Sequence, residues 1–523
     1  MILEPGILPL LVWFLAAAFA GTNLRDRAAP FESVGPIASH GRIDELAFAR
    51  WKQLGIQPSG PCSDEVFLRR AYLDVIGTLP TPDEADRFLG DADRGKRAAL
   101  IDRLLARDEF PDYWALKWSD LLRVKSEFPI NLWPNAVQAY YRSIHSAIAA
   151  NLPYDRWARQ LLVSSGSNFR APEVNFYRAV GSRDPQAIAQ AVALTWMGSR
   201  ASQWPKPRLD GMAAFFSRVG YKSTSEWKEE IVYFDFTQPT PAGAAFPDGR
   251  AARLTPGEDP REVFTAWLLA PDNAWFAANA VNRIWYWLLG RGIVQEPDDI
   301  RPDNPPANPE LLAYLERELV ASHYDLRHIY RLILNSQVYQ MSSIPRDSRA
   351  EAAANFAFYP VRRLDAEILI DAICQITGTA EDYSSPIPEP FTYLPENQRA
   401  TTIPDGSIGS AFLDMFGRPP RDTGLASERN NAITAEQRLQ LLNSSHIQQK
   451  IQQSVKLRTL AQAGRTPREP VERLYLAILS RYPTSKELQT VAAYFQASKA
   501  NRWQAATDLA WALINSAEFL YRH

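Results

Sequence analysis

The chain of 523 residues contains only two cysteines, Cys62 and Cys374, and only six histidines. This scarcity excludes a disulfide-rich scaffold, a zinc finger built from cysteines and any C-x-x-C motif. No histidine pair has the spacing H-x-H or H-E-x-x-H, which disfavours a metallohydrolase. The two cysteines lie in different halves of the chain, so a disulfide between them and two separate thiols both remain open.

An excess of charge of one sign is also missing. The 57 Lys and Arg residues nearly balance the 59 Asp and Glu residues, which gives a net charge of −2 and an isoelectric point near 6.4. A protein that binds nucleic acid through a broad basic surface has a clear positive excess. We therefore expect no nucleic-acid partner.

Long apolar runs are scarce, and the one that exists lies at the start of the chain. Ile7–Ala20 has 14 residues and ends in Ala-x-Ala, whereas a membrane-spanning helix needs ~20 residues. It predicts a signal peptide cleaved near Ala20 and export to the periplasm or cell envelope. Glu4 precedes the run and no Lys or Arg does, so an uncleaved anchor and an apolar start without a targeting role remain alternatives. No membrane span is expected after it.

Helix-start signals recur along the rest of the chain. Thr81–Glu84 forms a capping box with proline in the first helical position, and Asp259–Glu262 repeats this arrangement with an aspartate cap. Similar caps begin at Asn308, Thr434 and Thr484. Strand signals are few, so the predicted fold is mainly α.

Two irregular stretches divide the helical pattern. Gln238–Asp259 is rich in proline and glycine and follows the short β-prone run Ile231–Phe234, and Thr379–Asn431 is a long irregular loop region. We predict two helical domains joined by a short β-prone connecting segment. The expected order is a signal peptide at 1–20, a linker at 21–40, a domain at 41–237, a linker at 238–258 and a C-terminal domain at 259–523.

The segment Trp275–Leu289 predicts an apolar core helix that carries a few polar groups on one face. These are Asn279, Asn282, Arg283 and Tyr286. A buried arginine needs a carboxylate partner, which Asp298 or Asp299 supplies in principle. Two interpretations remain open: an internal polar network that fixes the following loop, and the floor of a ligand pocket.

A calcium site near this helix is a weaker hypothesis. Carboxylates that supply hard oxygen ligands occur together at Asp298, Asp299 and Asp303. Their spacing matches no EF-hand loop, and turns beside proline favour aspartate for conformational reasons. No metal site is predicted.

Arginines beside aromatic and amide residues mark two loop regions as candidate binding surfaces. The relevant side chains are Arg170, Arg178, Arg418 and Arg421. A guanidinium group can recognise a carboxylate, a sulfate or the edge of a sugar, whereas structural salt bridging is the alternative.

The loop region 405–430 also contains candidate acid and base groups for a hydrolase. These are Asp405, Asp422 and Glu428, one of which would need a raised pKa. No spacing there identifies a nucleophile with its base. Elsewhere, His446 fits a core or capping role better than catalysis, and the acidic run around Trp227 is predicted to be a solvated helix face.

Several strings together resemble the planctomycete family of paired domains, a cytochrome-like domain followed by a planctomycete-specific domain of unknown function. The first set is Phe67–Gly77 (FLRRAYLDVIG) with Leu79–Pro82, and the second comprises Asn282–Trp285, Gly290–Val294, Asp298–Asp299, Asn304–Pro306 and Asn308–Leu312. The resemblance covers roughly residues 42–520. It implies an exported, mostly helical bacterial protein often associated with cytochrome-type domains, and it supplies no catalytic residues.

The chain departs from that family in one respect. Many relatives carry a C-x-x-C-H haem-attachment motif and a further histidine before an aromatic-rich helix, where this chain has Thr195–Trp204 (TWMGSRASQW). Covalent attachment of c-type haem requires two thiols beside an axial histidine. We therefore expect no c-type haem and predict no cofactor.

Three functions remain compatible with the sequence. The first is a non-catalytic envelope protein that binds a glycan or a partner protein through surfaces rich in arginine and tryptophan. The second is a hydrolase whose site lies in the 405–430 loop region. The third is a relative of an electron-transfer protein that has no haem.

Overall fold

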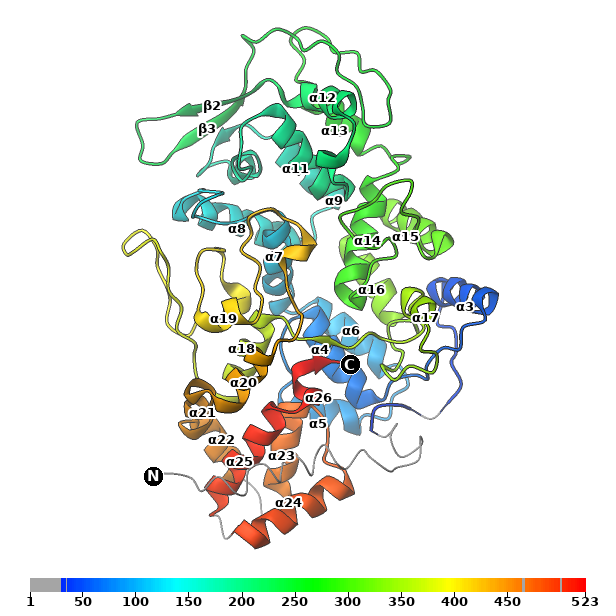
Figure 1. The fold of residues 1–523 in the computed structure, drawn as a ribbon, viewed down its shortest axis with the longest axis vertical. Coiled ribbons are helices and arrows are strands. Elements are labelled where there is room, and N and C mark those ends of the chain that lie inside the picture. Colours follow the sequence, from blue (N-terminus) through cyan, green and yellow to red (C-terminus); the bar gives the residue numbers. More distant parts are fainter. Residues whose placement is uncertain (1–29, 34, 463–465, 499–500) are drawn as a thin grey trace.

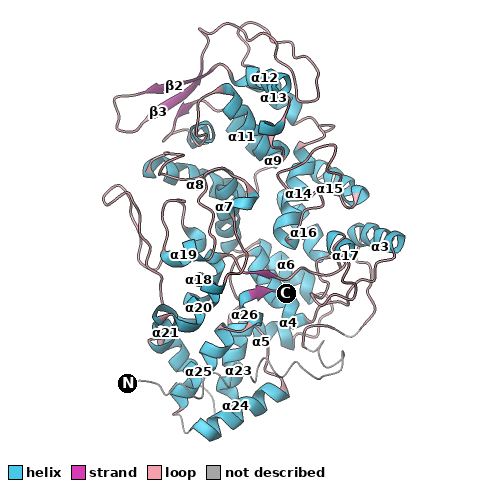
Figure 2. Cartoon of the chain, viewed as in Figure 1, coloured by secondary structure: helices cyan, strands magenta, loops and turns pink. Residues whose placement is uncertain are grey.

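The computed structural model describes residues 30–33, 35–462, 466–498 and 501–523. The predicted signal peptide lies outside the described residues. The described chain is mainly helical with a few short strands, which confirms the predicted fold class (Figure 2). None of the described helices is long and apolar enough to cross a membrane.

The N-terminal half consists of short helices connected by turns. They are α3 (Arg42–Leu54), α4 (Asp64–Val75), α5 (Pro82–Gly90), α6 (Lys96–Leu105), α7 (Glu109–Leu121), α8 (Pro134–Ala149), α9 (Tyr154–Val163), α10 (Asn175–Arg178), α11 (Pro185–Met197) and α12 (Lys206–Ala213). Three 3₁₀ turns supplement them, η1 (Pro172–Val174), η2 (Ala201–Gln203) and η3 (Ala214–Phe216).

The C-terminal half continues this pattern and ends beside the N-terminal helices. Its helices are α13 (Pro260–Leu268), α14 (Phe276–Leu289), α15 (Pro309–Ala321), α16 (Leu326–Asn335), α17 (Ala350–Ala354), α18 (Ala366–Thr377), α19 (Ala411–Met415), α20 (Ala435–Asn443), α21 (Ser445–Gln452), α22 (Val455–Gln462), α23 (Arg468–Leu479), α24 (Ser485–Ser498), α25 (Arg502–Ile514) and α26 (Ala517–Leu520). The long loop region between α18 and α20 contains only α19 and the 3₁₀ turns η4 (Ala400–Thr402) and η5 (Ala426–Glu428).

The predicted caps begin helices as expected. Thr81 forms a complete capping box with Glu84 at the start of α5, and Thr434 forms one with Gln437 at the start of α20. The Asn308 side chain accepts a hydrogen bond from a backbone N–H of α15. Each cap satisfies an N–H that the helix itself leaves unpaired, which is why the sequence locates these helix starts well.

The β-prone run forms the centre of a small antiparallel sheet with the order β1–β3–β2. Its strands are β1 (Gly166–Ser167), β2 (Val219–Ser223) and β3 (Glu230–Phe234), and Tyr221 pairs with Val232. The prediction of a helix face around Trp227 is wrong, because Trp227 lies in the turn of the β2–β3 hairpin. Lys228 has φ of +59° there, which a helix does not allow.

Helix α4 joins the two halves of the chain. Arg69 donates to the carbonyl groups of Ile478 (2.8 Å) and Phe519 (2.9 Å), and Arg70 donates to that of Tyr339 (2.6 Å). Figure 1 shows α4 close to α26 and the C-terminal end of the described chain. These buried arginines hold α4 against segments more than 250 residues later in the sequence.

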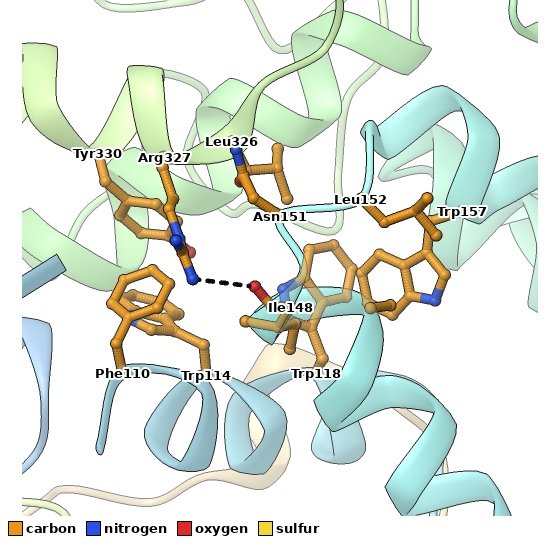
Figure 3. A pocket seen from close by; sticks show the side chains of 11 residues that line it. Phe110, Trp114, Trp118, Ile148, Asn151, Leu152, Trp157, Leu326, Arg327 and Tyr330 are labelled. Atoms are coloured by element: carbon orange, nitrogen blue, oxygen red, sulfur yellow. Dashed lines mark hydrogen bonds between the residues drawn. The ribbon is translucent and has the colours of Figure 1, made fainter. Parts of the chain in front are cut away.

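A cluster of aromatic rings forms the core around α7. Trp118 lies 4.8 Å from Trp157 and Trp114 lies 4.4 Å from Tyr330, measured between ring centroids. Figure 3 shows these rings around a cavity of about 20 Å³, beside the hydrogen bond from Arg327 to the carbonyl of Ile148. A space of that size accommodates about one water molecule and no larger ligand.

Candidate functional site

The polar face of α14 forms an internal network. The Asn279 amide donates to the carbonyl of Thr195 (2.9 Å), and the Asn282 amide donates to that of Val294 (3.0 Å). Arg283 donates to Asp298 over 2.9 Å. All three α14 side chains are buried, so the structure contains the network that fixes the following loop.

Asp298 also connects this network to the long loop region. Its second carboxylate oxygen accepts a hydrogen bond of 2.6 Å from the backbone N–H of Ala426. Asp299 and Asp303 each lie 3.2 Å from Arg301. The three aspartates therefore have cationic partners or backbone donors, and the described part of the chain contains no cluster of three or more metal-ligating side chains.

The arginines of the long loop region point inward. Arg418 donates to the carbonyl groups of Ile408 and Asp405, and Arg421 donates to the Asp120 carboxylate (2.9 Å). Both side chains are buried. They stabilise the conformation of the loop, because each guanidinium group donates hydrogen bonds to several carbonyl or carboxylate oxygens that would otherwise lack partners.

The other two candidate arginines differ from each other. Arg178 is largely buried and donates to the Glu230 carboxylate over 3.0 Å. The side chain of Arg170 is 78% exposed and lies 3.4 Å from Glu226 on the surface. The four candidate arginines thus do not form one exposed guanidinium cluster.

A buried network of charges, centred on the start of α18, lies behind the long loop. Asp365 accepts hydrogen bonds from Lys117 (2.7 Å) and Arg522 (3.1 Å), and Glu367 accepts two from Arg429 (2.7 and 3.0 Å). Burial alone would raise the pKa of both carboxyl groups. The surrounding cations outweigh burial, hold the pKa of Asp365 well below its usual range and lower that of Glu367 to about 2.

The three candidate hydrolase carboxylates lie in different environments. Asp405 is buried and accepts two backbone N–H groups, and Asp422 forms an ion pair of 2.6 Å with Lys125. Glu428 accepts a backbone N–H from Thr423 (2.6 Å), and its other oxygen is buried without a hydrogen-bond partner. Burial raises the pKa of Glu428, so it is the one that has the property a general acid needs. Hydrolysis at this loop stays a prediction.

Three aromatic rings from distant segments meet at the surface. Trp133 at the start of α8 lies 6.4 Å from Trp227 in the β2–β3 turn and 5.5 Å from Phe391 in the long loop region, between ring centroids. Lys228 lies 4.7 Å from the centre of the Trp133 ring. Trp227 is 68% exposed and Phe391 is 48% exposed. We call Trp133, Trp227, Phe391 and Lys228 the aromatic platform.

The backbone of the aromatic platform is strained. Trp133 has φ of +74° and Lys228 has φ of +59°, values that bulky side chains rarely adopt. Residues held in such conformations concentrate at functional sites, where the surrounding structure imposes them. Sequence reasoning missed Trp133 and Phe391, since no spacing links residues that come together from three separate segments.

Residues 195–199, the first half of the stretch where the resemblance places the haem motif of relatives, are buried. Trp196 is fully buried, and its ring centroid lies 5.6 Å from that of Tyr154. The only cysteines of the chain, Cys62 and Cys374, are separate thiols outside this stretch. The residues at Thr195–Trp204 supply neither thiols nor an imidazole and do not fit a c-type haem.

Comparison with known proteins gives a family but no function. Residues 42–203 match the family model PSCyt2, described as a protein of unknown function (DUF1549). Residues 260–495 match PSD1, also described as a protein of unknown function (DUF1553). No curated protein and no solved structure matches the chain. The matched segments contain the strings quoted for the resemblance, and the chain belongs to the planctomycete family that pairs a PSCyt2 domain with a PSD1 domain.

Proposed function

We propose that the chain is an exported, non-catalytic protein that binds a glycan on the aromatic platform. The observation that carries this proposal is the convergence of Trp133, Trp227 and Phe391 at the surface from three segments far apart in sequence. Large aromatic side chains are usually buried, and an exposed group of them is typical of an interaction surface.

The chemistry of the platform suits a sugar polymer. A pyranose ring has an apolar face of C–H groups that stacks on an aromatic face, and its hydroxyl groups remain free for polar neighbours. Lys228 provides a cation beside two of the rings. Because this ammonium group can donate to hydroxyl or sulfate oxygens, neutral and sulfated polymers are both candidate ligands.

Other macromolecules suit the platform less well. A stable protein–protein interface buries about 1,200–2,000 Å² in total, whereas three rings offer a small patch. Nucleic acid binding needs a positive surface, and the chain has a net charge of −2. The predicted signal peptide supports export, and an exported protein meets extracellular polysaccharide.

Affinity electrophoresis of the full chain in gels that contain xylan or carrageenan tests the proposal. Wild type should be retarded by at least one polymer without cleaving it. Trp227→Ala should lower the affinity about tenfold or more. Phe236→Ala is the matched control, since Phe236 is exposed beyond the other end of β3. Unchanged retardation of Trp227→Ala, or no retardation by any polymer in a broad panel, would overturn the proposal.

A further inference from the structure

A second feature of the surface is an open cleft of about 520 Å³ that shares no residue with the aromatic platform. It lies between the segment after α18, the start of α19, and helices α20 and α21. Its lining consists of Thr379, Ala380, Glu381, Asp382, Ser410, Ala411, Phe412, Gln440, His446, Gln449, Lys450 and Gln453. We call this the glutamine cleft. Its volume is within the range of small-molecule sites, about 300–1,000 Å³.

The floor of the glutamine cleft carries a buried carboxylate. The side chain of Glu381 is 6% exposed. Its Oε2 atom lies 2.8 Å from Nε2 of His446 and 3.1 Å from Nζ of Lys450. Burial alone would raise the pKa of Glu381, but the hydrogen bond from His446 and the charge of Lys450 lower it. The group is therefore an ionised hydrogen-bond acceptor near neutral pH.

The contacts of Glu381 leave acceptors free for a ligand. Both partners bind Oε2, so Oε1 keeps its lone pairs. The His446 ring also lines the cleft, and among the described residues none forms a hydrogen bond to its Nδ1 atom. Lys450 also donates a hydrogen bond to the carbonyl of Ala380. Its ammonium group therefore has two partners within the protein, Glu381 and this carbonyl.

The rim adds amide groups and one apolar side chain. Gln449 is exposed on α21, Gln453 is exposed directly after its last residue, and Gln440 lies on α20. Each glutamine amide can donate and accept hydrogen bonds. Phe412 lies edge-on to His446, with ring centroids 6.4 Å apart. The cleft thus combines a carboxylate oxygen that accepts hydrogen bonds with amides that both donate and accept them.

We infer that the glutamine cleft binds a neutral, polyhydroxylated ligand the size of one or two sugar units. Hydroxyl groups donate to Glu381 Oε1, and they exchange hydrogen bonds with the amides and with Nδ1 of His446. An anionic ligand fits less well, because it would face Glu381 and Asp382 while the Lys450 charge is already paired. The inference goes beyond the proposed function, because it concerns a separate site and a small ligand.

Ligand-observed NMR on the full chain, with glucose, galactose, N-acetylglucosamine and glucuronate as probes at millimolar concentration, tests the inference. At least one neutral sugar should show saturation transfer and should bind more tightly than glucuronate. The double variant Gln449→Ala, Gln453→Ala should weaken that binding about tenfold or more. Gln452→Ala is the matched control, since Gln452 is exposed on α21 without lining the cleft.

Two further variants test the role of Glu381 and distinguish the glutamine cleft from the aromatic platform. Glu381→Gln keeps the shape of the side chain, removes its charge and should also weaken neutral-sugar binding. Trp227→Ala should leave it unchanged even where it abolishes binding of polymers. Binding of no neutral sugar, a preference for glucuronate, or loss of sugar binding in Trp227→Ala but not in the glutamine double variant would overturn the inference.

Discussion

In both the buried charge network around α18 and the aromatic platform, side chains lie in surroundings that are unusual for their type. Arginines, which are mostly exposed in proteins, lie inside the molecule and tie together loops and helix ends, as Arg421 and Arg429 do on Asp120. Aromatic rings, which are mostly buried, lie outside at Trp227 and Phe391. The comparison teaches that a residue's chemistry identifies what it can bind, whereas its burial decides whether the partner is inside or outside the chain.

The largest expected effect comes from removing a carboxylate from the charge network. Glu367→Ala leaves the largely buried guanidinium group of Arg429 without its main partner and should reduce the free energy of unfolding by about 3–5 kcal/mol. Chemical denaturation monitored by circular dichroism measures this loss. Glu396→Ala, at an exposed loop position, should change stability by less than about 0.5 kcal/mol. Equal changes in the free energy of unfolding for the two substitutions would show that the network does not stabilise the fold.

Acidification should weaken the same network in the wild-type chain. The pKa of Glu367 is lowered to about 2 in the folded protein and is about 4.3 in an unfolded chain. The stabilisation is therefore complete above pH ~4.3 and is lost as the pH falls towards 2, with a contribution of about 3 kcal/mol from this group. Denaturation midpoints measured between pH 6 and pH 2.5 should decrease, and Glu367→Gln should flatten that dependence. A dependence as steep in the variant as in wild type would contradict this assignment.

The aromatic platform should respond in the opposite way, with lost binding and little lost stability. Trp133→Gly removes a ring but also relieves a backbone conformation with φ of +74°. Relief of about 1 kcal/mol of strain offsets part of the lost packing, so the free energy of unfolding should change by about 1 kcal/mol or less. Affinity for the retarding polymer should fall about tenfold, whereas Trp133→Phe should retain most of it. A strong destabilisation without loss of polymer binding would show that Trp133 stabilises the fold and does not bind the polymer.

The smallest effect is expected at Arg170. Its side chain is 78% exposed and 3.4 Å from Glu226, and such surface ion pairs contribute about 0–1 kcal/mol. Arg170→Ala should change both stability and polymer affinity only slightly, as measured by the same denaturation and electrophoresis experiments. A large loss of affinity would show that the binding surface extends from the platform to the β1 region, and it would support the prediction that Arg170 binds the ligand.

Local sequence signals identified much of the helical fold. The capping boxes at Thr81 and Thr434 marked helix starts, because a cap depends on residues three positions apart and needs no information from the rest of the chain. The run Ile231–Phe234 became part of β3 for a similar reason, since a run of β-prone residues is a local signal. The turn at Trp227 was missed because the charged residues around it suit an exposed helix as well as an exposed turn.

In the candidate sites, the sequence predicts contacts between residues that are close along the chain and does not predict contacts between distant segments. Arg283 pairs with Asp298, one of the two carboxylates that the sequence offered as partners, because a helix and the loop that follows it are close in sequence. Arg418 and Arg421 were predicted to be binding residues, but both are buried, and Arg421 donates to Asp120 and to the Val124 carbonyl just after α7. The pairing of Glu381 with His446 joins residues 65 positions apart, which no short motif specifies.

The sequence by itself determined the helical character of this protein, many of its helix starts and its membership of the paired-domain family. These properties depend on neighbours within a few residues or on strings that can be compared directly. Only the tertiary structure decided which arginines are internal, that Trp133, Trp227 and Phe391 share one surface, and that a buried carboxylate lies beneath three glutamines. The physical reason is that burial and contact depend on long-range packing, in which segments hundreds of residues apart exclude water from one side chain and leave another exposed.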